Sequence, residues 1–439
     1  MDLNHSRNAA AYLPPSCDFL AKRVFLPALI VSLNLLLIGL APAQAFTTLH
    51  TFTGSSNGAN PYAGLILSGN TLYGTSFSGG VAGKGTVFAV NTDGTGFTNL
   101  HSFTALQSNT NSDGGNPYAG LILSGNTLYG TSYYGGSSGN GTLFALNTNG
   151  TGFTTLHEFT GGSDGANPFT RLILSGSTLY GMTDEGGSSG NGMVFVVSTN
   201  GAGFTTLHSF AAGSGLFPNI TNSDGATPSE LILLGNTLYG TTEYGGSSGA
   251  GTLFAANTNG TGFTTLHSFT GGSDGANPNA GLILFGNTLY GTASYGGSSG
   301  NGTVFAINTN GTGFTTLHSF AALQSNTNTD GANPDGSLIL SGNTFYGTAL
   351  NGGSSGNGTL FSISFTPRLA ISHVGTNVIL TWPTNVAGFD YTGFTLQSTT
   401  NLVSPAGWNT VSPVSVVVSG QNTVTNPISG TQKFYRLSQ

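Results

Sequence analysis

Charged side chains are scarce in this chain of 439 residues. Asp, Glu, Lys and Arg make up 5% of it, against about 25% in an ordinary globular domain. The formal net charge is −7, and Lys and Arg form no tract anywhere in the sequence. Neutralising phosphates requires clusters of basic residues, so nucleic acid is not expected as a partner. Asn, Thr, Ser and the 71 glycines must meet the solvent instead.

Cysteine is almost absent, because Cys17 is the only one, and it precedes an apolar run over residues 24–40. Two basic residues lead into this run, and Ala43-Gln44-Ala45 fits the small-x-small rule for signal cleavage. Residues 1–45 are therefore predicted to be a secretory signal peptide. The alternative is an uncleaved N-terminal anchor, since the run approaches the length of a short transmembrane helix.

Cleavage after residue 45 would leave a chain without cysteine, which excludes disulfides and thiolate metal sites. We expect an exported protein, secreted or on the cell surface and bacterial, that is not inserted into a membrane once the signal is removed.

One motif, Leu-Tyr-Gly or Phe-Tyr-Gly, is present in abundance. It occurs six times, with 51 to 59 residues between consecutive copies. A repeat of that period is typical of a solenoid, a propeller or an array. The six tyrosines are Tyr73, Tyr129, Tyr180, Tyr239, Tyr290 and Tyr346.

Each copy predicts four β-strands. In the second copy the expected strands are residues 121–124, 127–132, 142–147 and 153–159. The pairs Gly125-Asn126 and Asn149-Gly150 are tight hairpin turns. Bulky side chains fall on both faces of these strands, which favours a sheet packed on both sides, as in a propeller blade.

The count of strands predicts how the copies are arranged. Strands one to three occur six times, but the fourth follows only the first five copies, and its missing counterpart stands at the front, in residues 46–52. We therefore predict an all-β fold with a six-bladed β-propeller over residues 46–365. Its last blade would be completed by the N-terminal strand, which leaves few unpaired edges.

The repeated segments LYGT, GG…GTLF, TTLHSF and DGANP resemble the bacterial GloVer tandem-repeat (choice-of-anchor) family of exported proteins. The order of the strands also resembles kelch-like β-propeller repeats, although the kelch tryptophan is absent. The resemblance covers residues 46–365. It implies an exported, propeller-like array and supplies no catalytic residues.

The composition changes after Pro367, and both tryptophans lie beyond it. Residues 378–382, 394–397, 408–411, 414–419 and 434–437 are predicted to be short strands at the spacing of a β-sandwich. Residues 366–439 thus resemble a fibronectin-III-like or immunoglobulin-like module.

We expect the long loops to share one rim of the propeller and to form its binding face. Two sets of polar residues recur in the copies, one in these loops and one on the fourth strands. Five aspartates precede glycine and have two interpretations: a ring of Ca²⁺ ligands or, as we favour, turn residues that cap backbone amides. The histidines of the fourth strands are expected to be structural and remote from the rim. The aspartates are Asp113, Asp164, Asp224, Asp274 and Asp330.

Charged residues that break the repeat are the candidate binding site. Five of them fall in two neighbouring copies, where the other copies carry mostly glycine, aromatic or small residues: Arg171, Asp184, Glu185, Glu230 and Glu243. Rim tyrosines could add stacking surfaces for sugar rings: Tyr133, Tyr134, Tyr244 and Tyr295. The alternatives are drift on a solvated loop for the charges and packing between blades for the tyrosines.

No catalytic motif is visible in the sequence. We expect a non-enzymatic binding or adhesion protein whose partner is an extracellular glycan or surface polymer, with no cofactor unless Ca²⁺ binds. Two alternatives stay open. One is a secreted polysaccharide hydrolase or lyase that uses Asp184, Glu185 and Glu243. The other is a structural spacer for the C-terminal module.

Overall fold

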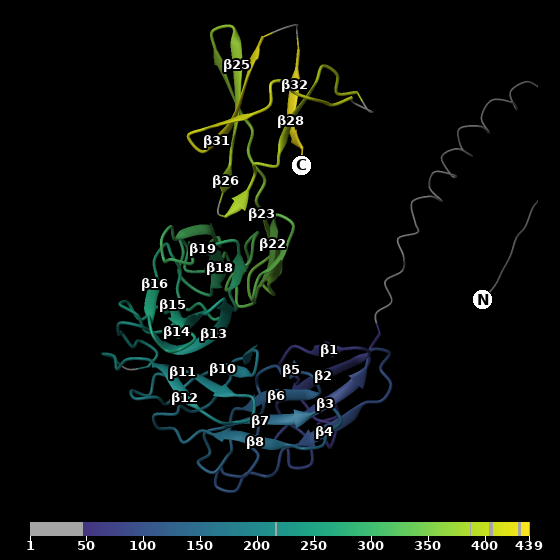
Figure 1. The fold of residues 1–439 in the computed structure, drawn as a ribbon, viewed down its shortest axis with the longest axis vertical. Helices are drawn as coiled ribbons and strands as arrows, with labels where there is room; N and C mark the ends of the chain where they lie inside the picture. The colour runs from purple at the N-terminus through teal and green to yellow at the C-terminus, as the bar shows by residue number, and fades with distance from the viewer. Residues whose placement is uncertain (1–46, 216, 387, 404–406, 429–431, 439) are drawn as a thin grey trace, which may run out of the picture. The chain divides into compact units, whose positions relative to one another are not determined.

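The computed structural model describes residues 47–215, 217–386, 388–403, 407–428 and 432–438. All regular elements in these ranges are β-strands (Figure 1). The predicted signal peptide lies outside the described residues. Within the described ranges, no helix has the length and apolar character needed to cross a membrane.

The six sequence copies correspond to six antiparallel sheets, which we number as repeats 1 to 6, each with the loop that leads into it. Repeats 1 to 3 contain β1 (Ile66–Ser68), β2 (Thr71–Ser76), β3 (Thr86–Asn91) and β4 (Thr98–Ser102); β5 (Ile122–Ser124), β6 (Thr127–Ser132), β7 (Thr142–Asn147) and β8 (Thr154–Glu158); and β9 (Ile173–Ser175), β10 (Thr178–Thr183), β11 (Met193–Ser198) and β12 (Thr205–Ser209).

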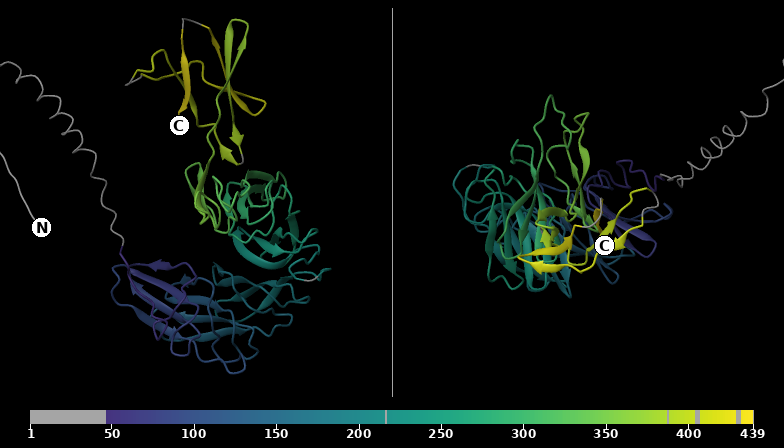
Figure 2. Two further views of the ribbon diagram at one scale, coloured as in Figure 1. Left: turned by 180° about the vertical axis from the view of Figure 1, so that it is seen from behind. Right: turned by 90° about the horizontal axis from the view of Figure 1, so that it is seen from above.

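Repeats 4 to 6 contain β13 (Ala226–Leu234), β14 (Thr237–Tyr244), β15 (Thr252–Asn257) and β16 (Thr264–Ser268); β17 (Ile283–Phe285), β18 (Thr288–Ala293), β19 (Thr303–Asn308) and β20 (Thr315–Ser319); and β21 (Ile339–Ser341), β22 (Thr344–Ala349) and β23 (Thr359–Ser364). In each of these six sheets the strands lie side by side in sequence order. Figure 2 shows the chain from two further directions. The predicted four-stranded unit is confirmed for repeats 1 to 5.

The sequence explains this pattern locally. Thr, Tyr, Val and Phe, which favour strands, fill the second and third strands of each repeat. Turn glycines such as Gly125, at φ 56°, adopt the left-handed conformation that closes a tight hairpin. The third strands of repeats 1, 2, 4 and 5 are buried at every position except the last, so these sheets are packed on both faces as predicted.

Consecutive repeats bury two complementary faces. The face of repeat 1 that meets repeat 2, its trailing face, contributes Tyr73, Val87, Ala89 and Phe103 to one hydrophobic cluster. The face of repeat 2 that meets repeat 1, its leading face, contributes Leu121, Leu128, Phe144 and Leu146 to the same cluster. The same pairing of faces recurs along the chain, so each repeat is stabilised by its neighbours.

The long loops share one end of the sheets, as predicted. In repeat 3, the loop that leads into the first strand pairs with the segment after the second strand, because Ala166 and Glu185 exchange backbone hydrogen bonds of 2.8 and 3.1 Å. Equivalent bridges occur in repeats 1, 2, 5 and 6. This places residues that follow the second strand beside residues that precede the first.

The predicted closure of the ring is not confirmed. The described residues of the closing segment, 47–52, form no strand, and the sheet of repeat 6 has three strands. The structure thus shows an all-β protein with repeated antiparallel sheets, without the pairing between the first and last copies.

The C-terminal region contains two main sheets. One has the order β24 (Ala370–Val374), β25 (Asn377–Pro383), β31 (Gln421–Pro427) and β30 (Val416–Val418); the other has β29 (Asn409–Thr410), β28 (Thr395–Thr399) and β32 (Phe434–Ser438); a short hairpin joins β26 (Asn385–Val386) and β27 (Phe389–Asp390). Five of these strands match the predicted positions, whereas β24, β26, β27 and β31 were not predicted. The two sheets share a core that includes Leu380, Trp382, Leu396 and Val424.

Candidate functional site

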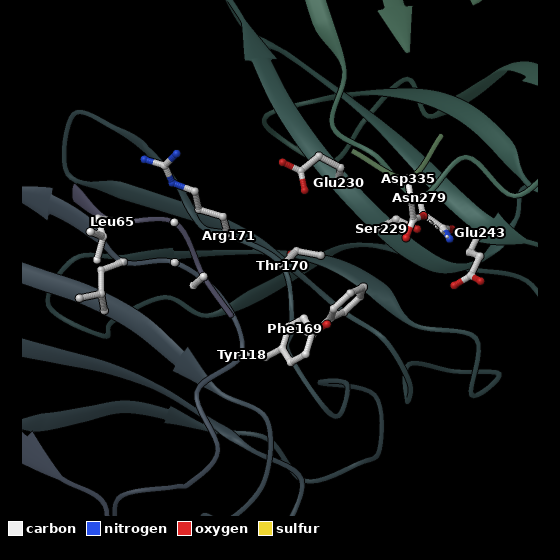
Figure 3. Close-up of a pocket in the computed structure, with 14 residues that line it drawn as sticks. Leu65, Tyr118, Phe169, Thr170, Arg171, Ser229, Glu230, Glu243, Asn279 and Asp335 are labelled. Atoms are coloured by element: carbon white, nitrogen blue, oxygen red, sulfur yellow. Dashed lines mark hydrogen bonds between the residues drawn. The ribbon is translucent and has the colours of Figure 1, made fainter. Parts of the chain in front are cut away.

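A cavity of about 460 Å³ lies at the long-loop end and is lined by residues of all six repeats (Figure 3). Most of the lining residues occupy the short stretch between the loop proline, which recurs in all six repeats, and the first strand. Because this stretch recurs in every repeat, the side chains at aligned positions decide the chemistry of the cavity wall.

The position directly after the loop proline divides the repeats into two groups. Repeats 1 to 3 carry aromatic rings there, and repeats 4 to 6 carry polar side chains: Tyr62, Tyr118 and Phe169 against Ser229, Asn279 and Asp335. All of these residues except Tyr62 line the cavity, and the Tyr62 ring lies 5.5 Å from that of Tyr118. Figure 3 shows Tyr118 and Phe169 together, apart from the group of Ser229, Asn279 and Asp335.

The polar wall is a connected group of acceptors and donors. Asn279 donates an amide N–H to Asp335 at 3.3 Å, and the Ser294 hydroxyl donates to the same carboxylate oxygen at 3.0 Å. Burial raises the pKa of Glu243, hydrogen bonds from Tyr244 and Asn279 oppose the rise, and the Asp335 charge adds to it. The Asn279 carbonyl oxygen is buried and has no hydrogen-bond partner among the described residues.

Arg171 and Glu230, which replace glycine in the repeat, both line the cavity. Glu230 reaches this position through an irregularity in β13, where the register shifts between Pro228 and Glu230. Burial raises the pKa of Glu230, and the positive charge of Arg171 opposes that rise. No hydrogen bond or ion pair joins the two side chains in the part of the chain described, although both line the cavity.

Asp184 is not among the lining residues, but it lies close enough to Glu243 for the charge of Glu243 to act on it. The Tyr133 hydroxyl donates a hydrogen bond of 3.2 Å to its Oδ2 atom, while its Oδ1 atom is buried without a partner among the described residues. Burial raises the pKa of Asp184 to about 6, the bond from Tyr133 opposes the rise, and the charges of Glu185 and Glu243 add to it. A carboxyl group with this pKa is partly protonated near neutral pH.

The other predicted site residues lie around the cavity rather than in it. Glu185 is exposed, and Tyr134 and Tyr295 are 42% and 53% exposed. Tyr244 contacts the site indirectly, through its hydrogen bond to Glu243. The structure therefore brings together Arg171, Glu230 and Glu243, with Tyr133 and Asp184 adjacent.

The repeated aspartates do not form a ring of free carboxylates. Each accepts a hydrogen bond from the histidine of the preceding fourth strand, at 2.8 to 3.1 Å, as in His208 to Asp224. Backbone amides add to this, as in Ala211 to Asp224. The expectation that the histidines lie far from these loops is wrong, because the loop folds back onto the strand. Among the described residues, no three His, Cys, Asp or Glu side chains gather as a metal site.

Sequence reasoning missed four of the residues that shape the cavity, namely Phe169, Ser229, Asn279 and Asp335. None of them is unusual by itself, since each is a common loop residue after a proline. Aligning that single position over all six repeats would have revealed the change from aromatic to polar side chains. The search for charged residues alone could not find it.

Known structures with similar folds are distant. Oligogalacturonate lyase from Vibrio parahaemolyticus is 9% identical over 68% of this chain and 75% of its own, with a TM-score of 0.42. The designed Ika8 protein is 15% identical over 73% and 93%, with a TM-score of 0.40. A chain of a nidogen–laminin complex is 13% identical over 61% and 82%, with a TM-score of 0.35. Similarity at this level carries no argument about function.

Curated protein sequences contain no match to this chain. The family comparison is decisive, because the model of one repeat family matches twice in tandem, over residues 37–228 and 216–401. Together the two matches span most of the chain and all six repeats. The chain belongs to the Gloeobacter/Verrucomicrobia repeat family.

Proposed function

We propose that this protein is an exported binding protein that holds a carbohydrate in the cavity at the long-loop end. The observation that carries the proposal is the division of one wall position into an aromatic half and a hydrogen-bonding half. A pyranose ring offers apolar C–H groups on its faces and hydroxyls at its edge. Rings such as Tyr118 can cover a face, while at the edge Asn279 can donate or accept and Asp335 can accept.

The size of the cavity agrees with this assignment. Its volume of about 460 Å³ lies within the range of small-ligand pockets, roughly 300–1,000 Å³. The acidic groups Glu230, Glu243 and Asp335 outnumber Arg171 on the wall. Neutral or amine-bearing sugars are therefore expected in preference to acidic ones, whose carboxylates would be repelled.

The finer architecture is part of the same proposal. We take the six repeats to be the blades of a six-bladed β-propeller over residues 46–365, because a single cavity is lined by all of them. Residues 366–439 are taken as a fibronectin-III-like module, supported by two short sheets around one core. Export would follow cleavage of residues 1–45.

A glycan array tests the proposal. We expect Tyr118→Ala and Asn279→Ala each to weaken binding of the sugars that the wild type retains by about tenfold or more, which corresponds to 1.4 kcal/mol. The matched control is Tyr295→Ala, because Tyr295 is an exposed rim tyrosine that does not line the cavity. Equal binding by the wild type and both cavity variants would contradict the proposal.

A second candidate function is a polysaccharide hydrolase or lyase. The observation that favours it is Asp184, a half-buried carboxyl group whose pKa is raised to about 6 and which lies near Glu243. A group of that kind can act as a general acid at neutral pH. Release of shorter sugars from a bound glycan, lost in Glu243→Gln with binding retained, would favour the enzyme over the binding protein.

A further inference from the structure

The two ends of the repeat region expose faces that are buried at every internal junction. On the trailing face of repeat 6, Leu360 is 77% exposed, whereas the aligned residues of repeats 1 to 5 are 0% exposed. On the leading face of repeat 1, Leu65 is 53% exposed, whereas its counterparts are 1% to 6% exposed. A trailing face and a leading face bury each other at all five internal junctions. The leading face of repeat 1 and the trailing face of repeat 6 have no such partner among the described residues.

Backbone packing shows the same complementarity. At each internal junction a glycine lies against the loop proline of the next repeat, so that a Cβ on Gly85 would stand 2.6 Å from the Cδ atom of Pro117. Gly358 is the aligned glycine of repeat 6 and has no proline among its nearest atoms. Pro61 is the aligned proline of repeat 1 and is exposed, while the other five are buried.

Residues 49–52 already lie on the leading face of repeat 1 in the way that a fourth strand lies on the next repeat. The His50 ring stacks on Phe97 at 3.5 Å, and in the next copy His101 stacks on Phe153 at 3.8 Å. The Phe52 ring lies 5.1 Å from that of Phe88, which is 4% exposed. This segment therefore has the contacts of a fourth strand on one side only.

Strand β23 of repeat 6 is less buried than the third strands of the internal repeats. Its residues alternate between half-buried and exposed, where the corresponding strand of repeat 5 is buried at all positions but the last. Within the described ranges, β23 pairs with β22 and with no further strand. Repeat 6 thus leaves open both the edge of β23 and an apolar face. At the internal junctions, a fourth strand covers the corresponding edge and the next repeat covers the corresponding face.

We propose that repeat 1 of the same chain covers the trailing face of repeat 6, with residues 49–52 paired along β23 as its fourth strand. Repeat 1 of a second copy of the chain could also cover repeat 6, but the lining of the cavity favours repeat 1 of the same chain. Leu65 of repeat 1 and Asp335 of repeat 6 line one cavity, so both ends of the array turn toward a common centre. The inference rests on the proposed six-bladed arrangement.

The internal repeats predict how residues 49–52 would be aligned with β23. In repeat 1, Thr86 of β3 lies opposite Ser102 of β4, and the Phe103 amide donates to the Gly85 carbonyl at 3.1 Å. By alignment, Thr359 is expected opposite Thr51, and the Phe52 amide is expected to donate to the Gly358 carbonyl. Directly opposite residues of antiparallel strands have Cα atoms about 4.5–5.5 Å apart, within the range that a disulfide spans, roughly 4.4–6.8 Å.

A cysteine pair tests this register in the full chain carrying Cys17→Ser, which otherwise contains no cysteine. We expect Thr51→Cys with Thr359→Cys to form a disulfide within one chain under mild oxidation, detected by mass and by non-reducing electrophoresis. The matched control is Thr303→Cys with Ser319→Cys, which are opposite residues of β19 and β20 at an internal position.

The outcomes separate the possible occupants. A disulfide in the control pair but none in the test pair would overturn the proposal. Covalent dimers from the test pair would overturn it in favour of a second copy of the chain. Absence of glycan binding both in the wild type and in a chain whose test disulfide forms would count against the proposed ligand and leave the closure intact.

Discussion

The internal junctions and the two open ends of the repeat region are built from the same residue types, but the structure treats them differently. Leu253 at an internal junction is fully buried, while Leu360 at the aligned position of the last repeat is 77% exposed. The residue type is the same at both positions, so it does not decide whether the side chain is buried. Burial comes from the neighbouring repeat, as expected for arrays whose stability is a sum of repeat and junction terms.

The largest expected effect comes from placing a charge at these two aligned positions. Leu253→Asp would bury an unpaired carboxylate, and we expect it to lower the free energy of unfolding by more than about 4 kcal/mol. If repeat 1 covers repeat 6, Leu360→Asp should cost more than about 1 kcal/mol, whereas at an open surface the change would stay within about 0.5 kcal/mol. Urea unfolding midpoints of the two variants measure the difference. A silent Leu360→Asp variant would mean that the ends stay open.

A smaller effect is expected from the phenylalanines that end the fourth strands. Phe269 is 0% exposed, and Phe269→Ala should destabilise the protein by about 3–5 kcal/mol. Phe52 is half-buried against Phe88 and Phe97, so Phe52→Ala should cost less, about 1–3 kcal/mol. Thermal unfolding followed by circular dichroism checks both variants. Equal losses would indicate that Phe52 is as fully enclosed in solution as Phe269.

The repeat itself could be predicted from the sequence because its signals are local. Hairpin turns at Gly125-Asn126 and strand residues such as those of β6 depend on neighbouring residues only, and both were placed within a residue or two. The pairing of residues 46–52 with the last repeat depends on contacts across the whole array. It could be proposed by counting strands, but the described structure does not contain it.

Only those parts of the candidate site that have a local signal in the sequence could be predicted. Arg171, Glu230 and Glu243 are conspicuous in a chain with few charges, and they do line the cavity. The contribution of Asn279 and Asp335 depends on how the loops of different repeats converge, which no single stretch of sequence records. The His–Asp pairs were missed because a loop of varying length folds back on its own strand in each repeat.

At the junction between repeats 2 and 3, the Tyr133 hydroxyl donates to the half-buried carboxyl group of Asp184, whereas the carboxylate that Ser294 meets at the junction of repeats 5 and 6, Asp335, is exposed. The native pKa of Asp184 is raised from 3.8 to about 6, chiefly by burial. The folded state therefore binds the proton more tightly than the unfolded state, and stability should fall as the pH rises from about 4 to about 6. Asp184→Asn keeps an acceptor for Tyr133 and removes the titration of this group. Its stability should therefore fall less steeply with pH than that of the wild type, while Glu230 and Glu243, whose pKa values are also raised, keep a slope of the same sign.

The expected gain at pH 7 is modest, about 1 kcal/mol, because the relief from burying a charge is offset by a buried amide N–H without a partner. Unfolding midpoints at pH 4, 5, 6 and 7 measure the slope. Glu185→Gln is the second variant: it removes an exposed carboxylate whose charge adds to the rise in the pKa of Asp184, so it should reduce the slope by less than Asp184→Asn does. A slope unchanged in Asp184→Asn would show that other groups set the pH dependence. A slope that Asp184→Asn reduces most would single out this junction as one whose stability responds to protonation beside the cavity.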